Sequence, residues 1–218
     1  MIATPPPTGP LPPPAHRWTT HARAAGVFLV LSVLVTGLAY PLVVTGIAEE
    51  IDPAAANGSL LKCPNGTVVG SADIAQNLSA GALGPGLFWA RPSLTDYNTT
   101  LGASTPPGPN DPALLALLNE TIDWLNSENA TGNTSPTATL PYWWVAPSGS
   151  SVDPDLTPGA VLVQVLRVSA NTHPFQSIAN LTALVNAHIT QPPLPDLGVP
   201  FVNVLELDID LLALEGTC

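Results

Sequence analysis

An uncharged apolar run occupies residues 24–48 near the N-terminus, with the sequence AAGVFLVLSVLVTGLAYPLVVTGIA. About 20 consecutive apolar residues are enough for an α-helix to cross a bilayer. The apolar region of a cleaved signal peptide is shorter, and this run continues through Tyr40 and Pro41 without a clean small-residue cleavage site. The pattern therefore predicts a retained transmembrane helix. It also predicts a kink at Pro41, tolerated where neighbouring helices satisfy the freed carbonyl group.

Charged residues on the two sides of this run predict its orientation. Two arginines precede it and three acidic residues follow it: Arg17, Arg23, Glu49, Glu50 and Asp52. Because basic residues stay on the cytoplasmic side, we expect residues 1–23 inside the cell and residues 49–218 outside it. The first fifteen residues are rich in proline and predict a disordered cytoplasmic tail.

Beyond the run, apolar residues recur at helical spacing in three segments. The first spans residues 111–128 and is capped by Asn110 or Asp111, the second begins at Thr157, and the third spans residues 174–189. Their apolar stripes are Leu114, Leu118, Ile122 and Leu125; Val161, Val165 and Val168; and Ile178, Leu181, Val185 and Ile189. The pattern predicts three helices in the region that follows the membrane span.

Three other segments predict β-structure. Residues 66–71 and 142–146 are short and apolar, and residues 201–211 alternate apolar with polar side chains as a half-buried strand does. The alternation changes phase at Val204, which suggests a bulge. The fold class expected from the whole pattern is a single N-terminal transmembrane helix, residues 24–48, followed by one extracytoplasmic α+β domain.

Two groups of acidic residues stand out in this domain. If the last segment is a strand, Glu206, Asp208 and Asp210 share one face, which we expect to be solvated and to attract cations. Asp153 and Asp155 lie in a turn before a predicted helix. They fit either helix capping or an oxygen-rich cation site. Both interpretations stay open.

The charge balance limits the partners of the chain. Its net charge is −11, and it has five basic residues: Arg17, Arg23, Lys62, Arg91 and Arg167. A strongly acidic chain argues against nucleic acid and against anionic lipid surfaces as partners. The lipid bilayer remains a partner through the apolar helix alone.

The single lysine, Lys62, excludes two kinds of ATP-handling site. It lies in Leu-Leu-Lys-Cys, so neither a P-loop nor a DKTG phosphorylation motif is present in the sequence. A GxSxG nucleophile motif is also missing. We therefore expect no catalytic residues, cofactor or metal in this chain, and any ATP hydrolysis linked to it in a partner.

Cysteines and glycosylation sequons each leave two interpretations open. Cys63 and Cys218 could pair in an oxidising exterior or remain independent thiols. Eight N-x-[ST] sequons lie beyond the apolar run, at Asn57, Asn65, Asn77, Asn98, Asn119, Asn129, Asn133 and Asn180. They fit either a glycosylated exterior domain or a simply polar surface.

Several motifs follow one another in an order that resembles the KdpC family of potassium-transporting ATPase subunits. The matching elements are YPL, TGIA and NGSL within residues 36–61, then GS at 70–71, FWARPS at 88–93, YN at 97–98, GPNDP at 108–112, SGSSVDP at 148–154, QVLRV at 164–168 and LGVPFVNVLEL at 197–207. Three places depart from the family pattern. Asp155 stands where the family has histidine, residues 101–107 are degenerate, and Phe201 replaces an arginine. Any role the family gives to those side chains is not carried over.

The resemblance implies a non-catalytic accessory subunit of a high-affinity, ATP-driven potassium uptake complex in the cell membrane. Its partners would be a channel-like potassium-binding subunit and a P-type ATPase subunit, and it would be needed for their assembly and activity. ATP and potassium would be handled by the complex. The family has also been described as raising the ATP affinity of the ATPase subunit. With the domain outside and ATP inside, that effect would be indirect.

Eight residues are candidates for contact with partners. They are Tyr40, Pro41, Thr45 and Gly46 in the membrane, and Arg91, Asp153, Gln164 and Arg167 outside it. Small side chains along the span allow close helix approach. Each arginine could instead pair with a carboxylate of its own domain.

Two other functions remain alternatives. The first is a free-standing, membrane-anchored surface binding protein, which would tolerate any apolar span. The second is an external hydrolase, in which one of Ser148, Ser150 and Ser151 would have to meet His173 or His188. A surface or half-buried histidine is the more ordinary role for His188.

Overall fold

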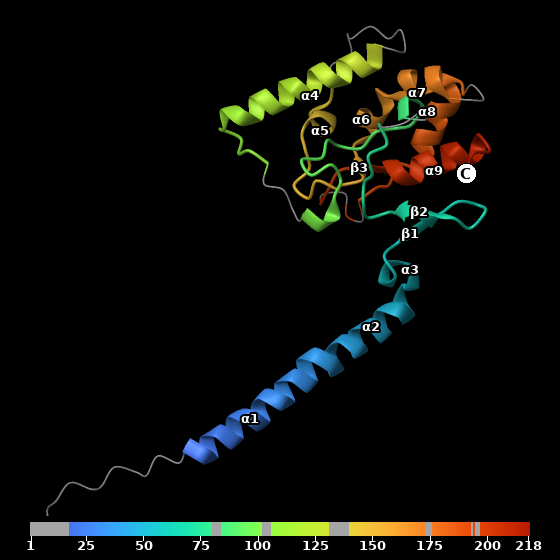
Figure 1. Cartoon of the computed structure of the whole chain (residues 1–218). Helices are drawn as coiled ribbons and strands as arrows, with labels where there is room; N and C mark the ends of the chain where they lie inside the picture. Colours follow the sequence, from blue (N-terminus) through green and yellow to red (C-terminus); the bar gives the residue numbers. More distant parts are fainter. Residues whose placement is uncertain are drawn as a thin grey trace, which may run out of the picture. The chain divides into compact units, whose positions relative to one another are not determined.

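The computed structural model describes residues 18–79, 84–101, 106–130, 140–172, 176–192, 194 and 197–218. Two units make up the chain, Met1–Ala56 and Asn57–Cys218. The first unit contains the apolar helix, and the second contains every strand of the described residues together with helices α4 to α9 (Figure 1).

One long helix dominates the first unit. It consists of α1 (Trp18–Leu34), the π-helical turn η1 (Val35–Ala39) and α2 (Tyr40–Ile51), and the short helix α3 (Pro53–Ala56) follows. Together Trp18–Ile51 form a 34-residue helix. Its most apolar 18-residue window has a mean hydropathy of 2.4, and none of that window is buried within the chain. The helix is long and apolar enough to span a membrane, and it contains the predicted run of residues 24–48.

Pro41 explains the π-helical turn. Proline has no N–H group to donate, and its ring crowds the carbonyl group four residues earlier, which here belongs to Gly37. The backbone N–H of Tyr40 donates to the carbonyl of Val35, five residues back instead of four. This widened turn makes room just before the proline. The predicted disturbance at Pro41 thus takes the form of one π turn inside a helix that continues to Ile51.

The second unit combines short helices with two small antiparallel sheets. Strand β1 (Leu60–Lys62) pairs with β2 (Val68–Ser71), and β3 (Asp155–Leu156) pairs with β4 (Val202–Asn203). The helical elements are η2 (Gly84–Gly86), η3 (Thr99–Leu101), α4 (Pro112–Ala130), α5 (Tyr142–Val145), α6 (Pro158–Leu162), α7 (Val165–Asn171), α8 (Ile178–Ala187) and α9 (Val204–Leu214).

The three helices predicted from apolar stripes are present. Helix α4 begins where expected, because the Oδ1 atom of Asp111 accepts the backbone N–H of Ala113 at 2.9 Å. Helix α8 begins later than predicted, at Ile178, and Ser177 caps it by accepting the N–H of Asn180. The helix predicted to start at Thr157 is divided into α6 and α7. Residues 174 and 175, the start of the third predicted helix, lie outside the described residues.

Two strand predictions are wrong. Residues Tyr142–Val145 form the short helix α5, and only Val202–Asn203 of the predicted last strand pair with another strand. The chain turns into α9 at Asn203, whose side chain accepts the N–H of Glu206 at 3.1 Å. An Asn followed three residues later by Glu is a helix-start signal that outweighs the short apolar alternation. The predicted strand over residues 66–71 is confirmed as β2.

The helical conformation of α9 also corrects the expected acidic face. Helical spacing separates the three carboxylates, so Glu206 and Asp210 are exposed whereas Asp208 is only 1% exposed. Asp208 lies on the same face as Val204 and Leu211, which are also buried. One of the three carboxylates therefore belongs to the core.

The core of the second unit draws on every helix from α4 to α9 and on the segment after η2. Its largest buried side chains include three aromatic or aliphatic groups distant in sequence, Phe88, Leu125 and Trp144. Each apolar stripe predicted from the sequence contributes to it, as the buried Val161, Val165, Val168, Leu181 and Val185 show. Burial of this apolar surface is the main stabilising contribution to the domain.

Candidate functional site

The four predicted contact residues of the apolar helix lie on its surface. Tyr40, Pro41, Thr45 and Gly46 are exposed within the first unit. A Cβ atom added at Gly46 would meet nothing within 4 Å, so the backbone there is open to another helix. Pro41 and Thr45 are four residues apart and share one face. Their contact with a partner stays a prediction.

Arg91 and Asp153 bind each other within the second unit. The Nη1 atom of Arg91 lies 3.2 Å from Oδ2 of Asp153. The same guanidinium donates to the carbonyl of Ala146 at 3.1 Å and to that of Pro147 at 2.8 Å, and it lies 5.5 Å from the ring centre of Trp143. Arg91 directly follows the buried segment that contains Phe88 and Trp89. Its contacts therefore join that segment to the loop that follows α5. Both side chains are part-buried, so a partner contact from this surface remains open as a prediction.

Gln164 lies in the interior, in the turn between α6 and α7. Its Oε1 atom accepts the backbone N–H of Trp89 at 2.8 Å, and its Nε2 atom donates to the carbonyl of Trp89 at 3.1 Å. A second donation reaches the carbonyl of Ala160 at 3.2 Å. The side-chain amide thus binds both backbone polar groups of Trp89, as the backbone of a paired β-strand would. With 0% exposure, Gln164 offers no surface to a partner.

Arg167 is the second buried candidate. Its Nη1 atom donates to the carbonyls of Pro85 and Leu87 at 2.6 and 2.8 Å, and its Nη2 atom donates to Oε1 of Gln164 at 2.8 Å. The guanidinium carbon lies 3.7 Å from the ring centre of Trp89. Burial lowers the pKa of Arg167 to about 9, while the carboxylates of Asp208 and Glu128 act in the opposite direction. The group is therefore charged at neutral pH and is held by neutral acceptors and an aromatic face.

Asp208 was missed in the sequence because its segment was interpreted as a strand. Its Oδ1 atom accepts the backbone N–H of Phe88 at 2.9 Å, and its Oδ2 atom is buried without a hydrogen-bond partner among the described residues. Burial raises the pKa of Asp208 well above its usual value, against the lowering effects of the Phe88 N–H group and of Arg167. Val204, Asp208 and Leu211 are spaced four and three residues apart, as on one face of a helix. This spacing is the sequence signal that could have identified Asp208 as a buried residue.

These three side chains share one task. Gln164, Arg167 and Asp208 bind the main chain of residues 85–89, which we call the clamped segment. Most of this segment lacks regular secondary structure although it is buried, so its polar backbone groups need partners from elsewhere. The QVLRV motif supplies two of those partners, and α9 supplies the third. This gives the motif a structural role inside the domain.

The variant Asp208→Asn tests the protonation of the buried carboxyl. A carboxyl whose pKa is raised by folding contributes stability below its unfolded pKa, near 3.8, and loses it as the pH rises through the folded pKa. The wild-type free energy of unfolding should therefore fall over this window by about 1.4 kcal/mol per pH unit relative to the variant, whose amide cannot ionise. Urea unfolding followed by tryptophan fluorescence at several pH values measures both curves.

The matched control is Asp123→Asn, since Asp123 is exposed on α4. Its stability should run parallel to that of the wild type at every pH. Parallel curves for Asp208→Asn and the wild type between pH 4 and 9 would instead mean that Asp208 is ionised throughout.

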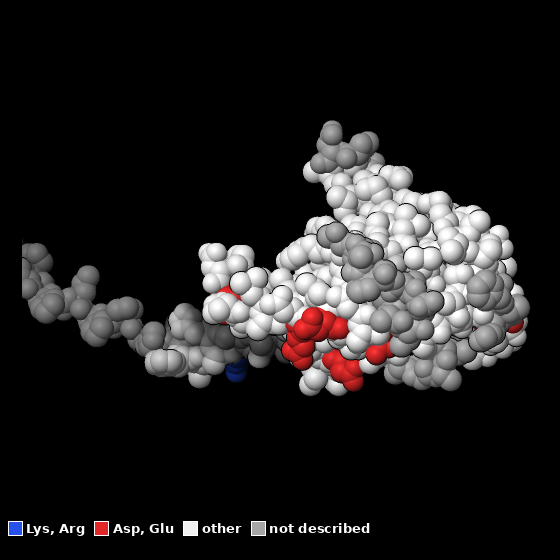
Figure 2. Space-filling model, turned by 90° about the horizontal axis from the view of Figure 1, so that it is seen from above, with Lys and Arg blue, Asp and Glu red and all other residues white. Residues whose placement is uncertain are grey.

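The Asp153–Asp155 turn caps no helix. The Oδ1 atom of Asp153 accepts the backbone N–H of Asp155, and α6 begins at Pro158 without a side-chain cap. Burial raises the pKa of Asp155 to about 6, with further increases from Asp153, Glu206 and Asp73 and a lowering hydrogen bond from Asn203. Figure 2 shows acidic side chains gathered in one area of the face in view. Among the described residues, no group of His, Cys, Asp or Glu has the arrangement of a metal site.

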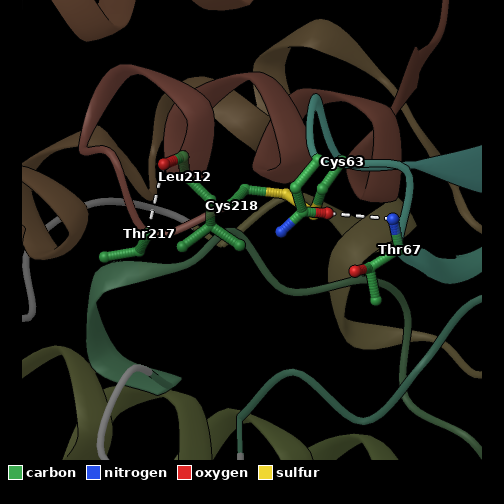
Figure 3. Close-up of a disulfide and its surroundings, with 6 residues drawn as sticks. Cys63, Thr67, Leu212, Thr217 and Cys218 are labelled. Carbon is green, nitrogen blue, oxygen red and sulfur yellow. Dashed lines mark hydrogen bonds between the residues drawn. A yellow bond between two sulfur atoms is a disulfide. The ribbon is translucent and has the colours of Figure 1, made fainter.

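Cys63 and Cys218 form a disulfide, which settles the alternative left by the sequence. Their Cα atoms are 5.2 Å apart although 155 positions separate them in the chain. Cys63 lies in the β1–β2 hairpin, where its N–H group donates to the carbonyl of Thr67 (Figure 3). Cys218 follows α9, and the N–H groups of Thr217 and Cys218 donate to the carbonyl of Leu212. The bond ties the C-terminus to the start of the domain.

His188 is engaged in contacts that do not involve a serine. Its Nδ1 atom lies 3.0 Å from the carbonyl of Leu184, and its Nε2 atom lies 3.1 Å from Oδ2 of Asp210. Both ring nitrogens therefore have partners. His173, the other candidate base, lies outside the described residues.

Comparison with known proteins connects this domain to a family. The family model described as "K+-transporting ATPase, c chain" matches residues 22–213, nearly the whole chain. The chain belongs to the KdpC family. A relative from Ralstonia nicotianae is 40% identical over 87% of this chain and 89% of its own length. Relatives from Caulobacter vibrioides and Dechloromonas aromatica are each 38% identical, over 87% and 88% of this chain and 91% and 96% of their own lengths.

All three relatives bear the same name, potassium-transporting ATPase KdpC subunit. The family match includes the apolar helix from residue 22 onward, the clamped segment and the helices that hold it. The resemblance first noted from YPL, FWARPS, SGSSVDP and QVLRV is therefore confirmed at the level of the family.

Proposed function

We propose that this chain is a non-catalytic accessory subunit of an ATP-driven potassium uptake complex in the cell membrane. The observation that carries the proposal is the KdpC family match across residues 22–213. Relatives that cover about nine-tenths of both chains bear the name of a potassium-transporting ATPase subunit. The proposed partners are a channel-like potassium-binding subunit and a P-type ATPase subunit, whose assembly and activity require this chain.

The exposed apolar helix supports membership in a membrane complex. None of its most apolar window is buried within the chain, so its whole surface is available to lipid and to other helices. The small residues Thr45 and Gly46 permit close approach of a neighbouring helix. The π turn before Pro41 leaves a local irregularity that a partner helix can recognise. We propose this part of the helix, from Tyr40 to Gly46, as the contact with the partner subunits.

Two independent features support a domain outside the cell. Arginines precede the helix and acidic residues follow it, which favours a cytoplasmic N-terminus. The Cys63–Cys218 disulfide supports the same placement, because such bonds persist in oxidising compartments and are rare in the cytosol. An effect on ATP affinity, implied by the family resemblance, would then have to pass through the membrane parts of the complex.

Copurification is the test of the subunit role. The tagged full chain is expressed in its native host under potassium limitation and purified in mild detergent. We expect a large P-type ATPase and a channel-like membrane protein to accompany it in comparable amounts. In a second preparation, the variant Gly46→Leu on the exposed helix should bring down less of these two partner proteins. A matched change at Gly26, where an added Cβ atom also meets nothing within 4 Å, serves as the control.

Two results would count against the proposal. If the chain emerges alone from several detergents, it acts as a free-standing surface binding protein instead. If both glycine variants retain the partners equally, the subunit role stands but the contact does not lie at Gly46.

A further inference from the structure

The eight sequons are not equivalent in the folded chain. Among the described residues, three sequons start in exposed turns of the second unit, at Asn57, Asn65 and Asn98, and two lie within helices, at Asn119 in α4 and Asn180 in α8. For an asparagine modified in the folded domain, our criterion is an exposed side chain with a free Nδ2 atom and with the hydroxyl of the residue two positions later beside the same amide. The hydrogen bonds of each sequon therefore show which asparagines fit that requirement.

Asn98 meets this requirement most completely. Its Oδ1 atom accepts the backbone N–H of Thr100 at 2.9 Å and the Oγ1 hydroxyl of Thr100 at 2.7 Å. Residues Asn98, Thr99 and Thr100 are all exposed. Among contacts between the described residues, the Nδ2 atom makes no hydrogen bond, so it is free to react. The turn thus holds the amide and the hydroxyl of the sequon together at the surface.

Asn65 has a similar turn at the tip of the β1–β2 hairpin. Its Oδ1 atom accepts the backbone N–H of Thr67 at 2.9 Å, and residues Asn65, Gly66 and Thr67 are exposed. Gly66 adopts a φ of 85°, which favours glycine and brings Thr67 back toward the asparagine. The nearby Cys63–Cys218 disulfide anchors the base of this hairpin without covering its tip.

The helical sequons lack this geometry. Residues two apart on a helix point roughly 200° away from each other, so the hydroxyl cannot lie beside the amide of Asn119 or Asn180. Asn77 differs again. Its Oδ1 atom accepts the hydroxyl of Ser79, but its Nδ2 atom already donates to Asp96 at 3.0 Å. These three asparagines are therefore poor acceptors once the domain has folded.

We propose that Asn98 and Asn65 carry N-linked glycans, and that Asn77, Asn119 and Asn180 do not. The donor is a sugar linked through phosphate to a lipid carrier. The Nδ2 atom forms a bond to the anomeric carbon, the bond from that carbon to the phosphate oxygen breaks, and the lipid phosphate leaves with its electron pair. One amide proton passes to a base of the transferase. The inference rests on the proposed exterior placement, and it requires that the transferase acts after the domain has folded.

Mass spectrometry of the full chain from native-host membranes tests the assignment. After digestion with Asp-N, which cuts before Asp73 and Asp96, fragmentation of the peptides should place the mass of a glycan on Asn65 and Asn98, whereas Asn77, Asn119 and Asn180 should be unmodified. Thr100→Ala should abolish the modification at Asn98, while Thr100→Ser, which keeps the hydroxyl, should retain it. Thr121→Ser, in the Asn119 sequon, is the matched helical control and should change nothing.

Unmodified Asn65 and Asn98 would overturn the proposal, and so would equal modification of the helical sequons, since addition would then precede folding. A C-terminal epitope separates this failure from a failure of the exterior placement. If protease removes the epitope on intact cells while Asn65 and Asn98 are unmodified, the domain lies outside the cell but the glycan assignment is wrong. If the epitope is protected, both are wrong.

Discussion

Replacing Arg167 by alanine is expected to lower the free energy of unfolding of the second unit by about 3–5 kcal/mol. The change removes all donors to the carbonyls of Pro85 and Leu87 and the stacking contact on Trp89. Leu87 and Trp89 are buried, so water cannot replace the guanidinium there without opening the core. Urea unfolding of the full chain in mild detergent, followed by the fluorescence of the buried tryptophans, measures the loss.

Two further variants make this test specific. Arg167→Lys keeps the positive charge but lacks the planar guanidinium group that donates to several acceptors at once. It should therefore retain only part of the stability that Arg167→Ala loses. Arg91→Ala is the matched control, because Arg91 also donates to two carbonyls but is part-buried and near the surface. We expect a loss of about 1–2 kcal/mol there. If Arg167→Ala costs no more than Arg91→Ala, the clamped segment does not depend on the buried guanidinium.

The double variant Cys63→Ser and Cys218→Ser is expected to lower the free energy of unfolding by roughly 2–5 kcal/mol. The bond closes a loop across 155 positions, so its loss frees a long stretch of the unfolded chain. The same urea titration measures the effect. Wild-type protein treated with a reductant should match the double variant, and the double variant itself should not respond to reductant. Equal stability of the oxidised wild type and the double variant would show that the disulfide adds nothing to the fold.

The sequence predicted those parts of the fold that depend on local periodicity. The apolar stripes of α4 and α8 repeat over several turns, and Asp111 caps α4 as predicted. The long apolar helix was equally clear, because 25 consecutive residues without charge have few other interpretations. In each case, neighbours within the same element determine the structure.

What the sequence did not predict depends on contacts between distant segments. Gln164 and Arg167 were proposed as partner contacts, and their buried role was not predicted because the segment they bind lies about 80 positions earlier and has no pattern of its own. Residues 201–205 alternate like a strand, and they do pair briefly at Val202 before Asn203 starts a helix. Asp208 therefore appeared on a solvated face, although tertiary packing buries it. Only the fold brings α7, α9 and the clamped segment together.

The covalent bond between Cys63 and Cys218 also makes residues 63–218 a closed ring. A protease that cuts the backbone once inside this ring does not release a fragment, because both pieces remain attached through sulfur. The polypeptide would keep its full mass under non-reducing conditions and separate only after reduction. The domain can thus be cleaved once within this ring and still stay joined to the apolar helix.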